Sequence, residues 1–447
     1  MSVTRMFRRL ARPRRLHGIA ALLIALSLSG RTIAADMLVN HSAAARIGLE
    51  RAWFAQIPLD PARSRVGTWY LYHDRLYGVT DSGIVTALDS ETGAQVWSKQ
   101  VGKAGFPAFG PGANDKYLGL VSGVRLYLLD RHDGTVVWVR ELGGAPSSGP
   151  ALSSEFAFVA LVTGRIEGYA IDDPKTQPWY YQSSGRTYLR PTVTGRVVSW
   201  PTSAGFLYVG RADDPGVLFR LETSDDIVTS PAAQSPYLYI ASLDGYLYCV
   251  HEFTGRERWR FSTGYSISSS PAIVAERAFV ASFQPALHAV DVATGKELWT
   301  AAGASHFAAM GKDRVYASDR YGNLLALDGK TGQQQGALPA SEGTSTLVND
   351  QSDRIFLVND RGLVQCLHEI GADQPTIYRT PHEPEDAETV RDADAGPVEA
   401  PDGIQPPAAE AGADQPRPLR DPADPGDEEP MDDEPAAGPG LGDDPFR

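Results

Sequence analysis

The sequence has little of several features that would point to particular folds or chemistries. It contains two cysteines in 447 residues, too few for a disulfide framework or for a structural zinc site built from thiolates. The apolar run at residues 19–28 is shorter than the roughly 20 residues that a membrane-spanning helix needs. The net charge of −14 leaves no surplus of lysine and arginine for a nucleic-acid-binding groove.

The negative charge is concentrated at the C-terminal end. Residues 380–447 hold 20 acidic and 4 basic residues together with 14 of the 32 prolines, and the span 35–379 carries only about −5. A segment of this composition cannot bury enough apolar surface to offset the entropy of ordering it. We therefore predict an acidic, proline-rich disordered tail over residues 370–447, acting as a spacer or as an arm for a basic partner or for divalent ions.

The N-terminal end has the layout of an export signal. Residues 1–34 contain seven arginines, six of which precede the apolar run, and small residues follow the run up to Ala34. This pattern predicts a signal peptide that is cleaved near Ala34, so the mature protein would be periplasmic or secreted. The apolar run is not followed by a cysteine, which argues against a lipid anchor. The pairs of adjacent arginines fit both general and twin-arginine export, so the export route stays open.

A short motif recurs along the chain with a period of about 40 residues. The segment AVDVATGKELW ends at Trp299, and ALDSETGAQVW ends at Trp97. Further copies, some of them degenerate, end at Trp138, Trp179, Phe219, Trp259 and Gly336. A period of this length, made of short apolar segments, is typical of a β-propeller in which each repeat is one four-stranded blade.

Within one repeat, the motif has a structural task. Residues 268–302 contain four short apolar segments that are separated by turn residues, which predicts four antiparallel strands. In the last turn Asp291 can accept hydrogen bonds from backbone N–H groups, and Gly295 can adopt the left-handed conformation that a short hairpin requires. The same pair recurs as Asp89 with Gly93, Asp130 with Gly134, and Asp328 with Gly332.

The two ends of the repeat region complete each other. After the seventh repeat the chain supplies only three more strand-like segments, TSTLVND, RIFLVND and LVQCLHE. The N-terminal segment LERAWFAQIPL places Trp53 where a fourth strand would carry its tryptophan. We therefore expect an all-β, eight-bladed propeller over residues 49–369, preceded by a lead-in at residues 35–48. The N-terminal strand closes the last blade and removes exposed sheet edges.

The repeat Ala-x-Asp-x-x-Thr-Gly-x-x-x-Trp resembles that of the quinoprotein-like (PQQ-like) β-propeller family, over about 320 residues. This family includes pyrroloquinoline quinone dehydrogenases and the non-enzymatic outer-membrane assembly scaffolds of the BamB type. The resemblance implies that the repeated aromatic residue packs between neighbouring blades. That role would fall to Trp53, Trp97, Trp138, Trp179, Phe219, Trp259 and Trp299. Gly336 departs from the pattern, so we expect blade seven to have the weakest joint.

The residues that quinone catalysis requires in this family are not evident. Such enzymes hold a metal with carboxylate and amide oxygens and typically carry a vicinal cysteine pair. Here Cys249 and Cys366 fall in blades five and eight, at a position that small residues occupy in other repeats. We expect them to be buried free thiols, too far apart for a disulfide. His251 and His368 replace the turn aspartate in the same two blades and are expected to cap turns.

Other catalytic motifs are missing as well. The sequence has no Cys-x-x-Cys pair, no His-x-x-x-His pair and no Gly-x-Ser-x-Gly elbow. We therefore expect no catalytic residue, no bound cofactor and no metal. The favoured function is an exported scaffold of the BamB type that binds a protein partner in the cell envelope. The alternatives are a PQQ-dependent or related oxidoreductase and a sensor propeller that binds a small ligand or a carbohydrate.

One segment stands out as a candidate contact site. The link between the third and fourth repeats contains Tyr180, Tyr181, Arg186, Tyr188 and Arg190. Tyrosine and arginine are enriched at protein interfaces, and the repeat places this link at one face of the disc. The sequence thus predicts a partner contact there, and it predicts neither nucleic-acid binding nor a transmembrane span after signal cleavage.

Overall fold

The structure is a computed structural model that describes residues 38–378 except 61, 104, 215 and 342. The predicted export signal at residues 1–34 and the predicted tail from residue 379 onward lie outside the described residues. Contacts divide the chain into Met1–Glu385 and Asp386–Arg447, and only the first of these units contains described residues. Among the described residues there is no helix with the length and hydrophobicity that crossing a membrane requires.

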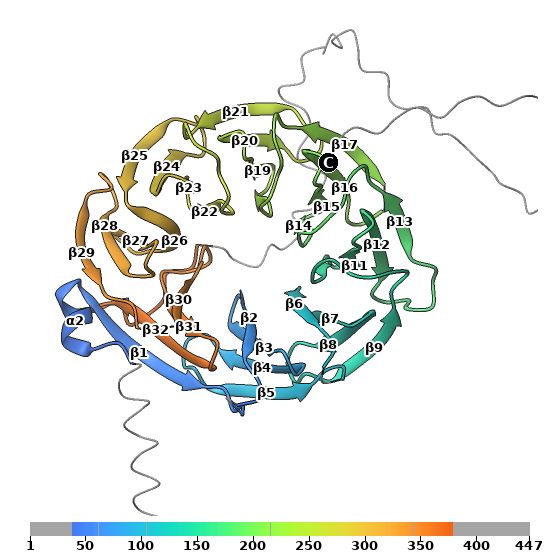
Figure 1. Cartoon of the computed structure of the whole chain (residues 1–447), viewed down its shortest axis with the longest axis horizontal. Helices are drawn as coiled ribbons and strands as arrows, with labels where there is room; N and C mark the ends of the chain where they lie inside the picture. The colour runs from blue at the N-terminus through green and yellow to red at the C-terminus, as the bar shows by residue number, and fades with distance from the viewer. Residues whose placement is uncertain (1–37, 61, 104, 215, 342, 379–447) are drawn as a thin grey trace, which may run out of the picture. The chain divides into compact units, whose positions relative to one another are not determined.

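The described chain forms eight four-stranded antiparallel sheets, arranged as blades around a central axis (Figure 1). Blade one is β2 (Val66–Tyr72), β3 (Arg75–Thr80), β4 (Ile84–Asp89) and β5 (Gln95–Gln100). Blade two is β6 (Ala108–Ala113), β7 (Tyr117–Ser122), β8 (Arg125–Asp130) and β9 (Val136–Glu141). Blade three is β10 (Ala151–Leu152), β11 (Phe156–Ala160), β12 (Arg165–Ala170) and β13 (Trp179–Gln182). Blade four is β14 (Thr192–Thr194), β15 (Val197–Pro201), β16 (Phe206–Arg211) and β17 (Val217–Glu222).

The second half of the ring repeats this order. Blade five is β18 (Ala232–Gln234), β19 (Tyr237–Ala241), β20 (Tyr246–His251) and β21 (Glu257–Ser262). Blade six is β22 (Ala272–Val274), β23 (Arg277–Ser282), β24 (Ala286–Asp291) and β25 (Glu297–Ala302). Blade seven is β26 (Ala304–Met310), β27 (Arg314–Asp319), β28 (Leu324–Asp328) and β29 (Gln334–Leu338). Blade eight is β30 (Thr344–Leu347), β31 (Ile355–Asn359), β32 (Leu363–Glu369) and β1 (Leu49–Gln56).

The ring closes through the N-terminal strand, as the sequence predicts. Strand β1 pairs antiparallel with β32 from Leu49 opposite Glu369 to Gln56 opposite Leu363, and Trp53 lies opposite Cys366. The last blade therefore joins segments from both ends of the described chain. The predicted eight-bladed propeller with an N-terminal closing strand is confirmed.

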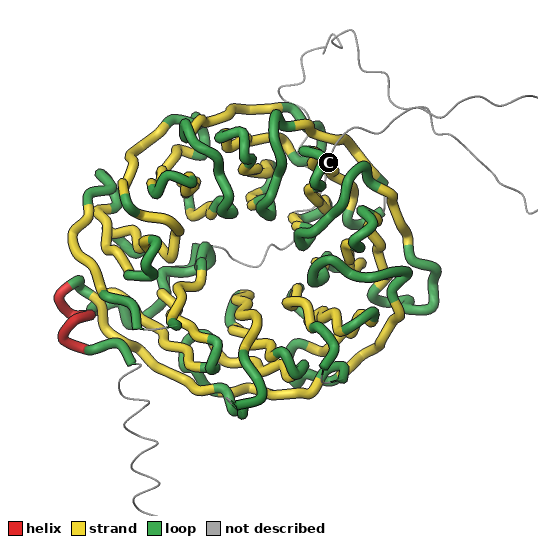
Figure 2. Tube along the Cα trace, viewed as in Figure 1, coloured by secondary structure: helices red, strands yellow, loops and turns green. Residues whose placement is uncertain are grey.

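The position of a strand in its blade decides how it is buried. The second strands, such as β19 with its sequence YLYIA, are buried along almost their whole length because neighbouring blades cover both faces. The outermost strands bury one face, and in β5 only Trp97 is buried. The tube trace shows strands joined by loops all around the ring, with the helix at its rim (Figure 2).

The antiparallel order of strands gives the ring two faces with different loops. One face carries the links from each blade to the next and the turns between second and third strands; we call it the interblade face. The other carries the turns between first and second and between third and fourth strands; we call it the hairpin face.

A repeated contact joins neighbouring blades on the hairpin face. The indole N–H of Trp53 donates to the carbonyl oxygen of Ser90 (3.2 Å) in the next blade, and the ring covers Gly93, where an added Cβ would lie 2.3 Å from it. The other indole bonds run from Trp97 to Arg131 (3.0 Å), Trp138 to Ile171 (3.0 Å), Trp259 to Val292 (2.9 Å) and Trp299 to Gly329 (3.1 Å). The turn glycine is therefore needed for the space it leaves as well as for its positive φ.

The two aromatic variants keep part of this arrangement. Phe219 covers Gly255, where an added Cβ would lie 2.7 Å from its ring, but a phenyl ring has no N–H to donate. Trp179 is partly buried against the cluster between blades three and four, which includes Phe158 and Trp200.

The lead-in occupies the gap that Gly336 would leave in blade seven. Residues before β1 form the helix α2 (His41–Arg46), which Asn40 caps by accepting from the N–H groups of Ser42 and Ala43. After this helix, Ile47 lies over Gly336, where an added Cβ would be 2.7 Å from its Cγ2 atom. Ala44, Ile47 and Leu49 belong to one buried cluster with residues of blades seven and eight. The expected weak joint is thus filled by a side chain from outside the repeat.

The described chain also remains packed on the ring beyond the predicted end of the propeller. Residues 370–378, which the sequence assigned to the disordered tail, include Ile377 in a β-bridge with Ser352. Tyr378 donates from its hydroxyl to the carbonyl oxygen of Met310 (3.0 Å) and packs against the core of blades six and seven. The assignment of these nine residues to the tail is corrected, because Tyr378 and its neighbours supply apolar surface and hydrogen bonds that the acidic stretch lacks.

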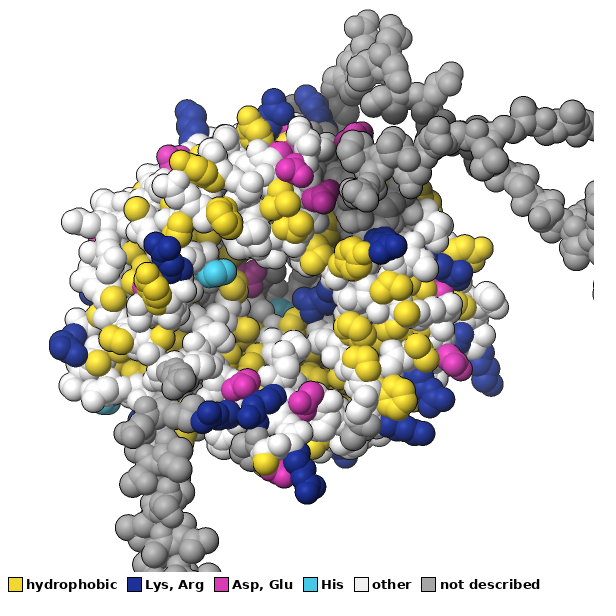
Figure 3. Space-filling view, viewed as in Figure 1, with side chains coloured by type: hydrophobic (Ala, Val, Ile, Leu, Met, Phe, Trp, Pro, Cys, Tyr) yellow, Lys and Arg dark blue, Asp and Glu magenta, His cyan; other side chains and the backbone are white. Residues whose placement is uncertain are grey.

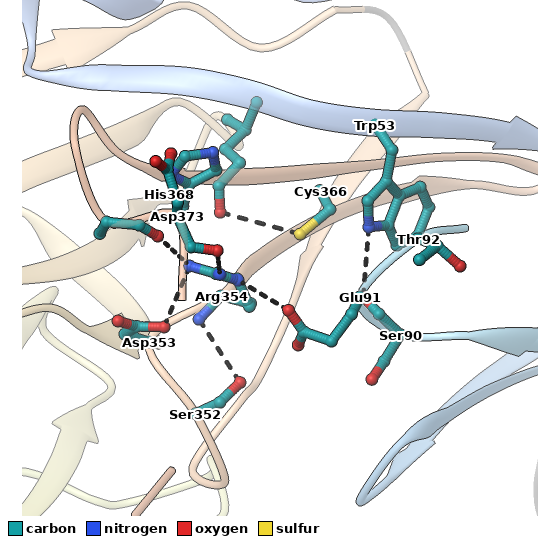
Figure 4. Close-up of polar contacts among 12 residues, drawn as sticks. Trp53, Ser90, Glu91, Thr92, Ser352, Asp353, Arg354, Cys366, His368 and Asp373 are labelled. Carbon is teal, nitrogen blue, oxygen red and sulfur yellow. Dashed lines mark hydrogen bonds and ion pairs between the residues drawn. The ribbon is translucent and has the colours of Figure 1, made fainter. Parts of the chain in front are cut away.

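A buried arginine holds this extension against the ring (Figure 4). The Arg354 side chain is 2% exposed and donates to the carbonyl oxygens of Ala372 and Asp373, each at 2.9 Å. Its guanidinium also pairs with Asp353 (3.3 Å) and with Glu91 of blade one (3.3 Å). Arg354 therefore links the end of the ordered chain, blade eight and blade one.

Replacement of Trp53 by alanine should destabilise the ring strongly. The change removes a buried indole and its hydrogen bond across the closing joint, and we expect a loss of about 3–5 kcal/mol in the free energy of unfolding. Urea unfolding followed by circular dichroism measures it. The neighbouring Phe54 is 53% exposed, so Phe54→Ala should change stability by less than about 0.5 kcal/mol. Equal effects of the two changes would contradict the closing role of Trp53.

Ile47→Ala should loosen the joint next to blade seven. Truncating this buried side chain opens a cavity beside Gly336, and we expect a cost of about 2 kcal/mol or more. Hydrogen exchange should become faster in β29 and β1 and remain unchanged in β9, on the far part of the ring. Unchanged exchange in β29 would show that the lead-in does not support this blade.

Candidate functional site

The turn aspartates act on their own turns. Asp291 accepts from the backbone N–H of Thr294 (2.8 Å) and from its hydroxyl (2.6 Å), and these bonds hold the pKa of Asp291 below its usual value. Asp328 accepts in the same way from Thr331. Asp89 accepts from the N–H of Thr92 (2.9 Å). These carboxylates are engaged in local hydrogen bonds that fix the hairpins.

The turn at Asp130 is built in a similar way, and the turn glycines share one conformation. The Asp130 carboxylate accepts from the N–H of His132 (2.7 Å). The φ angles are positive at all four partner glycines, namely Gly93 (70°), Gly134 (72°), Gly295 (71°) and Gly332 (70°).

The two cysteines are buried thiols on separate blades. Cys249 on β20 lies opposite Trp259 on β21, and Cys366 on β32 lies opposite Trp53 on β1. Both are fully buried and free. Burial raises the pKa of the Cys249 thiol to about 12 and raises that of Cys366 as well. Neither thiol is placed to act as a nucleophile or to pair with the other.

The two histidines at turn positions behave differently. The Nδ1 atom of His251 accepts from the N–H of Phe253 (3.2 Å), and burial lowers its pKa. It therefore replaces the turn aspartate, as the sequence suggested. His368 has no hairpin to cap because β32 pairs with the N-terminal strand instead of a following one. Its Nδ1 atom lies 2.9 Å from the carbonyl oxygen of Glu369.

The structure separates the two tyrosines of the predicted contact segment. Tyr180 and Tyr181 are neighbours on β13, so their side chains point to opposite faces of the strand. Tyr180 is 58% exposed and lies under the guanidinium of Arg165, 3.8 Å from the ring centroid. Tyr181 packs against Trp200 and Tyr208, within the core between blades three and four.

Arg186 and Tyr188 stay together on the interblade face, whereas Arg190 points inward. The Arg186 guanidinium donates to the Tyr188 hydroxyl (3.3 Å). Arg190 donates to the carbonyl oxygen of Pro111 on β6 (2.7 Å) and lies over the ring of Tyr70 on β2, 4.7 Å from its centroid. Arg190 thus ties the inner strands of three blades together, and the five predicted residues do not form one surface.

The interblade face carries a set of exposed apolar side chains that the sequence analysis did not single out. Phe283 and Tyr321, on the turns of blades six and seven, are 79% and 75% exposed. The other exposed large apolar residues of this face are Phe106, Val124, Val162, Tyr188, Val228 and Tyr265. The space-filling view shows hydrophobic and basic side chains around a central opening (Figure 3). In most other repeats the corresponding turn is polar, whereas the SFQP segment of blade six contains a phenylalanine. An aromatic residue at such a turn is the sequence signal that could have revealed these exposed side chains.

Two hollows lie beside these side chains. One has a volume of about 620 Å³ and is lined by Tyr265, Phe283, His306 and Arg320 together with serines and other small residues. A second, of about 680 Å³, lies beside Phe106 and Arg63 at the joint of blades one and two. These are open grooves between loops that combine aromatic surface with cationic and hydroxyl groups.

The first groove offers hydroxyl groups beside its aromatic surface. Ser269 donates to the carbonyl oxygen of Ala281 (3.0 Å) and Ser282 to that of Gln284 (2.7 Å). The Ser305 hydroxyl is buried without a hydrogen-bond partner in the described chain. None of the described lining residues pairs a hydroxyl with a histidine or carboxylate. The groove can therefore accept apolar anchors and hydrogen-bonding groups.

His288, Glu297 and Thr300 have the residue types of a catalytic triad but not its geometry. On the outer strands of blade six, Glu297 (2.8 Å) and the Thr300 hydroxyl (3.1 Å) both contact the same atom, Nδ1 of His288. A relay needs the acid on one ring nitrogen and the hydroxyl on the other. The Nε2 atom is buried without a partner in the described chain, so this group is a structural contact.

Comparison with known proteins finds relatives along most of the ring. The family model of outer membrane protein assembly factor BamB matches residues 50–172 and 220–372. The structure of BamB from Moraxella catarrhalis superposes with a TM-score of 0.57 at 20% identity, covering 72% of this chain and 97% of that chain. The C-terminal WD40 domain of Sif2 gives 0.56 at 11% identity, with 72% and 98% covered. The computationally designed Ika8 protein gives 0.56 at 14% identity, with 68% and 96% covered. At these identities the structural likeness shows the fold alone.

A curated relative matches over a shorter span. The serine/threonine-protein kinase AfsK of Streptomyces griseus is 25% identical over 239 residues, which cover 42% of this chain and 28% of the kinase. The match thus spans little more than a quarter of that protein.

The burial of both cysteines predicts slow reaction with thiol reagents. Burial raises their pKa values, so the native protein holds both as unreactive thiols at pH 8, and we expect Ellman's reagent to react at least about a hundredfold faster in urea. Since the folded pKa of Cys249 is about 12, its contribution to stability is complete at neutral pH and is lost as the pH rises from about 9 to 12. Rapid reaction of the native protein would contradict the buried positions.

Proposed function

Because the chain belongs to the family of outer membrane protein assembly factor BamB, we propose that it is an exported, non-catalytic scaffold that binds a protein partner in the cell envelope. The observation that carries this proposal is the exposed aromatic surface of the interblade face. Phe283 and Tyr321 are the two most exposed large apolar side chains among the described residues. Exposed aromatic side chains of this kind are typical anchors of protein interfaces.

The fold supports binding by rigid loops. The loops that carry Tyr265, Phe283 and Tyr321 begin and end in strands of blades five to seven. The hydrogen bonds of Trp259 and Trp299 join these blades to one another. Side chains that are held by such a frame lose little conformational freedom on binding. Arg320 and His306 beside them favour acidic or carbonyl-rich segments of a partner.

The absence of a catalytic role and the envelope location rest on separate grounds. The buried thiols, the local bonds of the turn aspartates and the bonds of the groove serines Ser269 and Ser282 to backbone carbonyl oxygens support a binding role. The basic and apolar layout of residues 1–34, together with the outer-membrane role in the family's name, supports export to the envelope.

The binding role is tested by changing the aromatic anchors. We expect Phe283→Ser with Tyr321→Ser to reduce capture of partners from solubilised envelope fractions by at least about tenfold, because each anchor contributes on the order of 2 kcal/mol. Quantitative mass spectrometry of proteins recovered with the wild type and with the variant measures the change. Phe253→Ser, on the hairpin face and 42% exposed, is the matched control and should leave capture within about twofold.

Further outcomes separate the scaffold from its alternatives. If Arg186→Ser with Tyr188→Ser reduced capture and the Phe283 and Tyr321 changes did not, the contact would lie at the link between blades three and four. Equal capture by all variants would contradict docking on the interblade face. Incubation with pyrroloquinoline quinone and calcium should give no bound quinone absorbance and no dye-linked dehydrogenase activity, and activity would contradict the non-catalytic role.

A further inference from the structure

We propose that Glu50, His368 and Asp373 form a binding site for one divalent transition-metal ion of the Zn²⁺ type at the closure of the ring. Each of the three residues offers one ligand atom, and these atoms lie within 4.8 Å of one another. Nitrogen and carboxylate oxygen ligands in this combination suit Zn²⁺ and its neighbours in the first transition row. This site lies on the closing seam and is independent of the proposed docking surface.

The fold brings these residues together from three segments that close the ring. Glu50 lies on β1 directly opposite His368 on β32, and Asp373 follows in the extension after β32. The Glu50 carboxylate is 4.0 Å from the Nδ1 atom of His368 and accepts from the N–H of Gly371 (3.3 Å). A bound ion would therefore connect the N-terminal strand, the C-terminal strand and the ordered extension.

The histidine is oriented as a metal ligand would be. The His368 side chain is 7% exposed, and its Nδ1 atom lies 2.9 Å from the carbonyl oxygen of Glu369. A carbonyl oxygen only accepts, so Nδ1 donates in this contact and Nε2 is the ring atom that would bind the ion. Metal-binding histidines commonly have this arrangement, in which a backbone carbonyl fixes the ring and the tautomer. In the described chain no hydrogen bond is recorded at Nε2.

The charge balance around the seam favours a cation. The ion pairs of Arg354 go to Glu91 and Asp353, and its contact with Asp373 is to the backbone carbonyl oxygen. The carboxylates of Glu50 and Asp373 have no ion pair with a lysine or arginine among the described residues. Two carboxylates beside one imidazole are a ligand set that suits a divalent ion. Figure 4 shows Arg354, His368 and Asp373 in this seam.

Binding requires a small inward movement of the two acidic side chains. Ligand atoms around a tetrahedral ion with bonds of about 2.1 Å lie roughly 3.4 Å apart. Asp373 is exposed and Glu50 is half-buried, so both can rotate toward the fixed imidazole. A water molecule would complete four-coordination. Because the ligands come together only in the folded ring, binding should stabilise the native state.

The test is a titration of the full-length, EDTA-treated protein with Zn²⁺ and with Co²⁺. We expect one tight site by isothermal titration calorimetry, a rise in Tm at saturating Zn²⁺, and the visible absorption of Co²⁺ bound by nitrogen and oxygen. Glu50→Gln and Asp373→Asn should each weaken the site at least about tenfold while leaving the Tm in EDTA unchanged. His368→Gln should abolish it, but this ring is buried, so the two carboxylate variants keep the test independent of folding.

One control variant and one control ion test whether the binding is specific to this site. His132→Gln changes an exposed histidine on a hairpin of blade two and should leave Zn²⁺ affinity and the Tm increase as in the wild type. Mg²⁺, which is bound mainly by oxygen ligands, should not raise the Tm. The proposal would be overturned by weak binding that persists unchanged in Glu50→Gln, Asp373→Asn and His368→Gln, since such binding would come from the acidic residues at 380–447 or elsewhere.

Discussion

The ring depends on the contact between one aromatic side chain and the turn of the next blade. An indole buried against a glycine fills the space between two sheets. Its N–H donates a hydrogen bond to a carbonyl oxygen that the ring itself shields from water. The joints of Trp53, Trp97, Trp259 and Trp299 thus combine apolar burial with a hydrogen bond. A closed ring multiplies this interaction, because no blade can leave without breaking two joints. The exceptions follow the same rule, since Phe219 and Ile47 fill the space where tryptophan is missing.

This constraint explains how one face of the molecule becomes available for binding. The tryptophan joints lie at the hairpin face, and turns of the interblade face such as those of Phe283 and Tyr321 take no part in them. Aromatic side chains such as those of Phe283 and Tyr321 are exposed there. The closing seam is the other special region, because three separate segments meet there and place polar side chains such as those of Arg354 and His368 in buried positions.

The repeat made much of the fold predictable from the sequence. The spacing of Trp97, Trp138, Trp259 and Trp299 predicts the length and number of the blades, and Trp53 predicts the strand that closes the ring. Both predictions are possible because the motif around each tryptophan is local and recurs. The position of Ile47 over Gly336 and the packing of Tyr378 occur once, between segments distant in sequence, so no period reveals them. The contact segment at Tyr180–Arg190 was chosen by residue type, and the alternation of β13 and the inward turn of Arg190 separated its members. Sequence alone could not show which turns leave aromatic rings exposed.

The central claim is that packing between an indole and a turn glycine couples adjacent blades. A double-mutant cycle of Trp97→Ala and Gly134→Ala, measured by urea unfolding, tests it most directly. An added Cβ at Gly134 would lie 2.6 Å from the Trp97 ring, while the strain of a positive φ is the same with or without the indole. The account predicts that Gly134→Ala costs at least about 1 kcal/mol more in the presence of Trp97 than in its absence. Equal costs in both backgrounds would contradict it.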